Sequence, residues 1–429
     1  MYFPRNIRYI NRRKNSLKSP LQLLYFVPRP EGVKDDQSIP ILFDWRPQGN
    51  YLASSNGTIS VRISDRYGEI FDDFNAPEKD KFLQWHKDGD YLAAVGSNSP
   101  QVTMYTVSIK EANEIDLGLA TKKTPVMGKH QRAITSGAFN DKGLLALGSE
   151  DATITISNAQ GDTVNSFGCN AEPEDVHYVK IFDEFDKNLD EYFITAVLSK
   201  RTLMVASALG SDPPVNLQFQ DKYGNIKKCC WYEKGHVLMA FENGTIVCLR
   251  LDRTPDKSQE MFSVKDFESY LSDLSLCLEA RMAICIGDNC IKVRHLDRLS
   301  ELTSLVTVED DQKGLDKVKA NNNGSLLAVT GKSGTMMIFL TKIPIIGSAY
   351  RDKIVYLSSL NKVKIHFDGD RDPIEIDVRV EPSHLSVSDY HIAVVTNNRA
   401  WFYELHTKSA LSAKHTDKAQ VRAPVSAVA

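Results

Sequence analysis

The feature that most constrains this chain is a short phrase that occurs twice. It runs from Trp45 to Ala53 and again from Trp85 to Ala93, 40 residues later. Both copies begin with tryptophan, place glycine four residues on, and end in Tyr-Leu-Ala. Looser copies, with an apolar residue, a glycine four residues later and an aliphatic pair, begin at Phe139, Trp231 and Ala320. A fixed period of this length indicates an array of similar structural units.

Two gaps in the array are each about twice the period, so each should contain a degenerate unit. The gap from Phe139 to Trp231 contains Tyr192–Val197 followed by Thr202–Val205. The gap from Trp231 to Ala320 contains Met282–Ile286 followed by Ile291–Val293. The array therefore reaches seven units by residue 340.

Each unit has the chemistry of an antiparallel hairpin. The turns at Asn56-Gly57 and Asn243-Gly244 supply the positive φ that tight hairpins need, and Ile59–Ile63 alternates with a period of two. No helical spacing of apolar residues continues for more than two turns between Ile41 and Leu340, which excludes βαβ folds and helical solenoids. The sequence predicts an all-β chain, a WD-type β-propeller of about seven four-stranded blades.

The usual WD dipeptides are only partly present. Gly128-Lys129-His130 approximates the Gly-His pair that begins a repeat, and Asp151 lies in the expected inner turn. Ser157-Asn158 stands where Trp-Asp would end the repeat. We expect the side-chain hydrogen-bond network of this blade to be incomplete.

Composition excludes several classes of protein. A formal net charge of -3 gives no reason to expect a nucleic-acid partner. No stretch reaches the roughly 20 apolar residues of a membrane-spanning helix, so we expect no direct membrane span. The seven cysteines are an odd number, scattered and mostly beside aliphatic residues, and we interpret them as buried thiols of a cytoplasmic protein: Cys169, Cys229, Cys230, Cys248, Cys277, Cys285 and Cys290.

No motif predicts catalysis or cofactor binding. Gly331-Lys332-Ser333 lacks the upstream glycine of a phosphate-binding loop, and the acidic run Asp368–Asp372 lacks the later glycine and glutamate of a calcium loop. We interpret the carboxylates from Asp183 to Glu191 as a solvated loop, and Asn56-Gly57-Thr58 and Asn243-Gly244-Thr245 as turns rather than glycosylation sites. Cys285 and Cys290 have no second ligand pair at zinc spacing. We predict no catalytic, cofactor-binding or metal-ligating residue, and we assign no partner-binding residue.

Beyond the repeat, about residues 40–406 resemble the N-terminal region of the WD-repeat subunits of intraflagellar transport complex A. The matching strings, in the family's order, are Gly128-Lys129-His130 with Ile134-Thr135, Leu144–Gly148, Gly161–Thr163, Phe219-Gln220 with Gly224–Ile226, Gly287–Lys292, Thr341–Gly347, Tyr356–Leu360 and Asn397–Tyr403.

This resemblance implies two propellers followed by a helical solenoid, with no enzymatic activity. It also implies a scaffold role in retrograde ciliary transport and in bringing membrane proteins into cilia. The implied partners are the other subunits of complex A and adaptors for ciliary membrane cargo, and the implied location is the cytoplasm, the cilium and the ciliary base. Two alternatives stay open at this point: a coatomer-like vesicle-coat propeller, and a propeller enzyme with a site in its channel. Against the enzyme, we expect the inner strands to present small or aliphatic residues such as Ala53, Ala93, Ala146 and Ala328.

Three departures from the family shape the expected domains. The 54 residues from Trp85 to Phe139 predict a missing unit before Gly128, which would leave the first ring open. The repeat pattern ends after His406, and no helical solenoid follows. We therefore expect the chain to be a fragment, a splice variant or the product of a faulty gene model. We expect a basic N-terminal tail and lead-in strand over 1–39, the first propeller over 40–345, the first blades of a second, incomplete propeller over 346–408, and a flexible tail over 409–429.

Overall fold

The computed structural model describes eighteen stretches of the chain. They are residues 9–10, 21–29, 40–48, 51–57, 59–76, 78–112, 116–126, 130–158, 162–181, 191–210, 213–233, 235–252, 258–308, 314–368, 372–378, 380–396, 400–405 and 415–419. Within them the regular structure is β-sheet, apart from one 3-10 turn, Asp221–Tyr223. The chain divides into two compact units, residues 1–341 and 342–429.

Unit 1 contains seven antiparallel sheets in its described residues, one for each repeat in the sequence. Each sheet is one blade of the propeller, and the blades are numbered in chain order. Within a blade, the strands are given from the innermost to the outermost. Blade 1 consists of β3 (Phe43–Trp45), β4 (Tyr51–Ser55), β5 (Ser60–Asp65) and β6 (Ile70–Asn75). Blade 2 consists of β7 (Asp80–Trp85), β8 (Tyr91–Gly96), β9 (Val102–Ala112) and β10 (Asp116–Val126). Blade 3 consists of β11 (Ile134–Phe139), β12 (Leu145–Ser149), β13 (Thr153–Ser157) and β14 (Thr163–Gly168).

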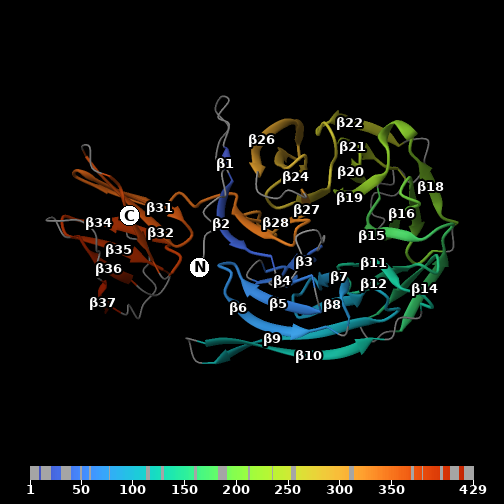
Figure 1. Cartoon of the computed structure of the whole chain (residues 1–429), viewed down its shortest axis with the longest axis horizontal. Coiled ribbons are helices and arrows are strands. Elements are labelled where there is room, and N and C mark those ends of the chain that lie inside the picture. The colour runs from blue at the N-terminus through green and yellow to red at the C-terminus, as the bar shows by residue number, and fades with distance from the viewer. Residues whose placement is uncertain are drawn as a thin grey trace. The chain divides into compact units, whose positions relative to one another are not determined.

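The remaining blades follow the same plan around the ring (Figure 1). Blades 4 and 5 are β15 (Pro173–Val179), β16 (Phe193–Leu198), β17 (Thr202–Ser207) and β18 (Val215–Gln218); and β19 (Ile226–Tyr232), β20 (His236–Phe241), β21 (Thr245–Arg250) and β22 (Gln259–Lys265). Blade 6 consists of β23 (Asp273–Cys277), β24 (Met282–Gly287), β25 (Cys290–His295) and β26 (Arg298–Val308), and β1 (Tyr9–Ile10) adds a fifth strand to it. Blade 7 consists of β27 (Leu315–Ala320), β28 (Leu326–Gly331) and β29 (Met336–Leu340), and β2 (Gln22–Val27) is its fourth strand.

The first ring closes, contrary to the expectation of a missing unit. Between Trp85 and Phe139 lie β8, β9 and β10 of blade 2 and then β11 of blade 3. Strands β9 and β10 have eleven residues each and pair over eleven positions. The N-terminal strand β2 pairs antiparallel with β29, so the outer strand of blade 7 comes from the start of the chain. Trp45 Nε1 of blade 1 donates to the carbonyl of Lys319 in blade 7 at 3.1 Å. Extra length in an outer hairpin, rather than a lost blade, explains the irregular spacing.

The hydrophobic core lies between neighbouring blades. The cluster of blades 2 and 3, for example, joins Ala93, Val95 and Val102 with Ile134 and Leu147. A blade has two apolar faces and can bury them only against its neighbours, and each fully buried Val, Leu or Ile contributes about 1.5–3 kcal/mol. Closure of the ring therefore stabilises every blade.

The glycine of the repeated phrase has a conformational role. Gly89, Gly143, Gly235 and Gly324 each lie in the turn between the first and second strands of a blade, with φ from +69° to +80°. Few residues other than glycine adopt this conformation without strain. At Gly324, an added Cβ would also lie 2.4 Å from the Cβ of Ala280 in the preceding blade.

Unit 2 contains two further four-stranded sheets among its described residues. They are β30 (Gly347–Tyr350), β31 (Lys353–Ser359), β32 (Lys362–Phe367) and β33 (Ile374–Asp377), and β34 (His384–Val387), β35 (His391–Val395), β36 (Ala400–Glu404) and β37 (His415–Ala419). Val355, Val363 and Ile365 of the first sheet pack against Ile392 and Val394 of the second. Strand β37 lies inside the segment expected to be a flexible tail, so part of 409–429 belongs to this sheet. The domain boundaries themselves stay a prediction.

Candidate functional site: the inner ring and hairpin face of the first propeller

The innermost strands of unit 1 carry charged side chains, which corrects an expectation. Ala53, Ala93, Ala146 and Ala328 lie on the second strands β4, β8, β12 and β28 rather than on the strands around the axis. Among the charged residues of the innermost strands are three aspartates and three lysines that come from five blades. We call this set the inner ring; its members are Asp44, Asp175, Asp273, Lys228, Lys317 and Lys319.

Asp175 links blade 4 to blade 5. Its carboxylate accepts from the backbone N–H of Cys229 at 2.6 Å and from the ammonium of Lys228, both on β19. His177 Nε2 lies 3.0 Å from the same carboxylate. Burial by itself would raise the pKa of Asp175, but the charges and hydrogen bonds of Lys228 and His177 outweigh it and hold this pKa below its usual range. The same pairing raises the pKa of Lys228 although burial opposes the shift.

Asp273 and Asp44 link the other blades of the inner ring. Asp273 of blade 6 accepts from the backbone N–H of Val318 in blade 7 at 2.9 Å. Burial raises the pKa of Asp273 more than the charges of Lys317 and Lys228 lower it. The carboxylate of Asp44 in blade 1 accepts from the backbone N–H of Trp85 in blade 2 at 2.7 Å. The same carboxylate forms an ion pair with Lys319 Nζ of blade 7 at 2.6 Å. Acid and base therefore alternate from blade 4 through blade 7 to blade 1.

A second set of contacts joins the turns between first and second strands, where the repeated glycines lie. We call it the hairpin circuit, and it crosses every junction between neighbouring blades in the described part of unit 1. From junction 1–2 onward, its contacts are Arg46 Nε to Gly89 O (2.8 Å), the His86 ring against Phe139 (5.0 Å), Tyr192 OH to Asp141, Gly235 N to Lys180 O (2.9 Å), Arg281 to Glu233 (2.8 Å), Cys277 Sγ to Asn322 O (3.1 Å) and Asn322 Nδ2 to Pro47 O (2.5 Å).

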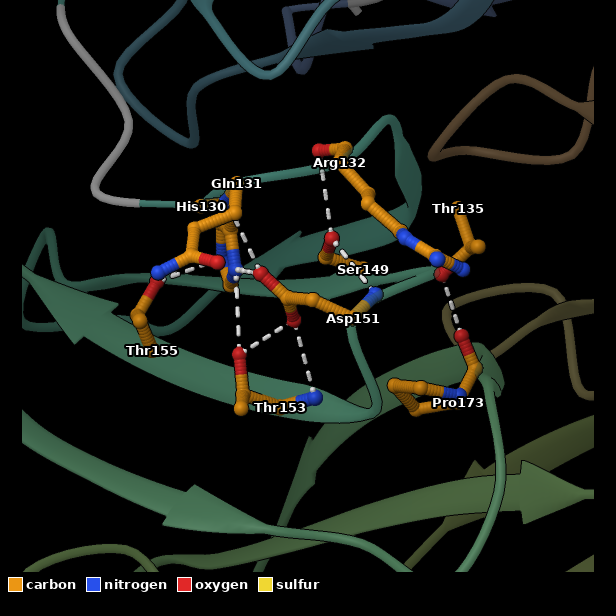
Figure 2. A network of polar contacts seen from close by, with 9 residues as sticks. All are labelled: His130, Gln131, Arg132, Thr135, Ser149, Asp151, Thr153, Thr155 and Pro173. Atoms are coloured by element: carbon orange, nitrogen blue, oxygen red, sulfur yellow. Dashed lines mark hydrogen bonds and ion pairs between the residues drawn. The ribbon is translucent and has the colours of Figure 1, made fainter.

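Blade 3 contains a polar network at the opposite ends of its strands (Figure 2). Asp151 Oδ2 accepts from the Gln131 N–H at 3.0 Å, and Oδ1 accepts from the N–H and hydroxyl of Thr153 at 3.0 and 2.5 Å. With its proton on Nδ1, His130 donates to Asp151 at 3.2 Å and accepts from Thr155 Oγ1 at 2.8 Å. The histidine, aspartate and threonine positions of a WD blade are thus joined, while Ser157 occupies the tryptophan position.

Replacing Asp151 with alanine tests the contribution of this network. The change leaves a buried histidine and two backbone N–H groups without their acceptor, so we expect a loss of about 2–3 kcal/mol. Urea unfolding at pH 7 measures it. Asp162→Ala, on the exposed turn of the same blade, is the matched control and should stay within about 0.5 kcal/mol of the wild type. Equal stability of the two variants would contradict the proposed role of Asp151.

The other motifs considered from the sequence have structural surroundings. Gly331 ends β28, and Lys332 and Ser333 lie in the turn that leads to β29. The Lys332 ammonium lies 5.1 Å from the ring centroid of Tyr270. Gly57 and Gly244 lie in hairpin turns with φ of 77° and 90°. All seven cysteines are free thiols. Residues 182–190 and 369–371 of the two acidic runs lie outside the described residues.

In the described residues, no group of three or more histidine, cysteine or carboxylate side chains is placed to hold a metal ion. None of the described helical segments has the length and apolar character needed to cross a membrane.

The inner ring was not predicted from the sequence, although two of its members, Asp44 and Lys319, occupy equivalent positions next to the repeated phrase. The position before each anchor of the repeated phrase is Asp44, Gln84, Ala138, Cys230 and Lys319, so the acid and the base that meet at junction 7–1 occupy equivalent places. Asp175 and Asp273 lie in the two degenerate units, where no anchor marks the register. Local sequence could not have paired them with Lys228 and Lys317.

Two relatives are similar in sequence to most of this chain. WD repeat-containing protein 19 of Mus musculus is 33% identical over 400 residues, which cover 85% of this chain and 30% of the relative. WD repeat-containing protein dyf-2 of Caenorhabditis elegans is 28% identical over 417 residues, 89% of this chain and 30% of the relative. The chain thus spans about 30% of the length of these relatives.

A solved structure shows the same fold at low sequence identity. The WD40 β-propeller domain of Doa1 superposes with a TM-score of 0.54 at 14% identity, covering 76% of this chain and 98% of that domain. Two family models also match: the WDR19 second β-propeller over residues 354–428, and the WDR19 first β-propeller over residues 41–122 and 119–334. The WDR19 first β-propeller model covers more than half of the chain, so the chain belongs to the WDR19 first β-propeller family.

Proposed function

We propose that this chain is a non-enzymatic scaffold subunit of intraflagellar transport complex A. In this role it supports retrograde ciliary transport and the access of membrane proteins to the cilium through protein–protein contacts. Its partners are other complex A subunits and adaptors for ciliary membrane cargo, and it acts in the cytoplasm, at the ciliary base and in the cilium. The observation that carries the proposal is the family match over residues 41–334 of a closed ring.

The geometry of the ring supports a scaffold rather than a channel enzyme. A general acid or base must reach the substrate proton, whereas Asp44 and Asp175 each bind a backbone N–H and an ammonium of neighbouring blades, and Asp273 binds a backbone N–H. These carboxylates hold the blades in fixed positions at the innermost strands. The hairpin circuit does the same at the turns between the first and second strands. A rigid closed ring presents its surface loops in a constant arrangement, which suits simultaneous binding of several partners.

Affinity purification tests this proposal. The full chain carries a tag and is expressed in ciliated cells, with the similarly folded WD40 domain of Doa1 as control for binding that any propeller would show. We expect complex A subunits to be enriched with this chain and not with the control. Recovery of vesicle-coat subunits instead would favour the coatomer-like alternative. Recovery of neither, with a chain that melts cooperatively, would overturn the proposal.

A further inference from the structure

The turn between the first two strands of blade 6, residues 278–281, differs from its counterparts in five other blades. Cys277 corresponds to the anchors of the repeated phrase, because it ends β23 and pairs with Met282 of β24 as Trp85 pairs with Leu92. Leu278, the residue after it, is 51% exposed. In the five blades with a marked anchor, the equivalent residue is at most 9% exposed: Arg46, His86, Asn140, Tyr232 and Asn321. Blade 6 thus exposes an aliphatic side chain where these blades bury a polar or aromatic one.

A short loop explains this difference. Four residues separate Cys277 from its strand partner Met282, whereas six separate Trp85 from Leu92. The carbonyl of Leu278 accepts from the backbone N–H of Arg281 at 3.2 Å, so Leu278 is the first residue of a tight β-turn. The loop has no further residues that could cover this side chain. The two exposed residues of the turn are Leu278 and Glu279.

Arg281 fixes the shape of this turn. It lies where five other repeats have glycine, and its φ of 52° strains a residue that has a Cβ. The guanidinium offsets this strain, because it donates to Glu233 of blade 5 at 2.8 Å and through Nε to Asp297 at 3.2 Å. On the other side of the turn, Ala280 lies against Gly324 of blade 7. A strained residue that neighbouring elements hold in place is typical of binding sites.

Carboxylates predominate around the exposed leucine. Glu279 is exposed and forms no ion pair within the described residues. The side chains of Glu233 and Asp297 are 49% and 47% exposed, and they share the one guanidinium of the turn. The next cation along the chain, Arg298, pairs with Glu301 at 3.0 Å. A partner surface that carries lysine or arginine would complement this excess of negative charge.

We propose that this turn is a docking element whose leucine inserts into an apolar pocket of a partner protein. Glu279 then pairs with a basic side chain at the edge of that pocket, and Arg281 is a positioning residue that keeps the turn in its bound shape. Single apolar residues are common on protein surfaces. Leu278 differs because its turn is already rigid, so binding costs little conformational entropy. The inference rests on the proposed function, since the partner is a subunit of complex A.

Site-specific crosslinking tests the contact on the full tagged chain, expressed in ciliated cells. A photoreactive amino acid replaces Leu278 in one chain and, in the control, Val164, an aliphatic residue that is 49% exposed on the outer strand of blade 3. We expect a complex A subunit to crosslink to position 278 at least fivefold more than to position 164. Complex A recovered without a crosslink at position 278 would overturn the docking element and leave the proposed function standing. If the unsubstituted chain recovers no complex A subunit, the proposed function fails and this inference fails with it.

Substitutions then separate the roles of the three side chains. Leu278→Arg should lower recovery of the crosslinked subunit at least tenfold, while Leu278→Met and the control Val164→Arg should leave it unchanged. Glu279→Lys should lower it at least threefold. Arg281→Gly restores the glycine of the repeat and removes the strain together with the ion pairs, so the chain should melt within a few degrees of the wild type and still lose binding. A Leu278→Arg chain that melts normally and recovers the subunit as the wild type does would exclude this turn.

Discussion

Deletion of residues 1–28 is expected to remove most of the stability of unit 1, because it removes the strand that completes blade 7. Strand β2 pairs with β29 from Gln22↔Leu340 to Val27↔Met336. Leu23 and Phe26 pack against the core between blades 6 and 7, and Tyr25 is buried at 7% exposure. Loss of these three side chains costs on the order of 5 kcal/mol, before any effect of opening the ring.

Tyr25 shows why the effect should spread beyond blade 7. Its ring lies against Gly68 in blade 1, so close that a Cβ at Gly68 would meet Tyr25 Cε2 at 2.9 Å. Strand β2 therefore connects the last blade to the first. Without it, both blades expose an apolar face, and neighbours that depend on them for burial lose support in turn.

Differential scanning fluorimetry measures this prediction. We expect the deleted chain to melt at least ~10 °C below the full chain, or without a cooperative transition, since 1 kcal/mol corresponds to about 2–4 °C in a domain of this size class. A chain that lacks only residues 1–20 keeps β2 and is the control; it should melt within a few degrees of the full chain. A deletion of 1–28 that melts like this control would show that β2 does not close the ring.

Replacement of Asp175 with asparagine is the second change with a large expected effect. Asparagine has nearly the same shape and tolerates the positive φ of 50° at this position, so the change removes mainly the charge. The ammonium of Lys228, half-buried at the junction of blades 4 and 5, then loses its counter-ion. Removing one partner of such a pair costs about 3 kcal/mol at pH 7. Urea unfolding measures the loss.

The pH dependence of this loss has a definite sign. The pKa of Asp175 in the folded chain lies below its usual value, so its ionised form stabilises the fold above the unfolded pKa of about 3.9. That contribution disappears as the pH falls through the folded-state pKa. The stability difference between wild type and Asp175→Asn should therefore be constant from pH 5 to pH 7 and shrink below pH 4. A difference that stays constant down to pH 2 would contradict the ion pair.

The double variant Asp175→Asn/Lys228→Met distinguishes a lost pair from general disruption. Methionine keeps much of the volume of the lysine stem and removes the uncompensated charge. We expect the double variant to recover at least half of the stability that the single variant loses. No recovery would mean that Asp175 acts mainly through its bond to the Cys229 N–H.

The repeated phrase predicted more of the fold than any other feature. Its anchors at Trp45, Trp85, Phe139 and Ala320 each end the innermost strand of a blade, and Trp231 lies one residue before the end of β19. The two long gaps contain blades 4 and 6. The prediction of a missing unit was wrong because strand length was read from spacing alone. A longer hairpin and an absent blade both change the spacing, and only the pairing of β9 with β10 distinguishes them.

The sequence by itself determined the repeat, the turn glycines and the family. These properties follow from short-range patterns, because strand alternation and positive-φ turns depend on residues that are neighbours in the chain. Tertiary structure decided the inner ring, the closing strand and the rigid turn of blade 6. Their contacts join residues far apart in sequence, such as Trp45 and Lys319, 274 residues apart. No local pattern encodes which of 52 basic residues meets which of 55 acidic ones; the geometry of the closed ring selects those pairs.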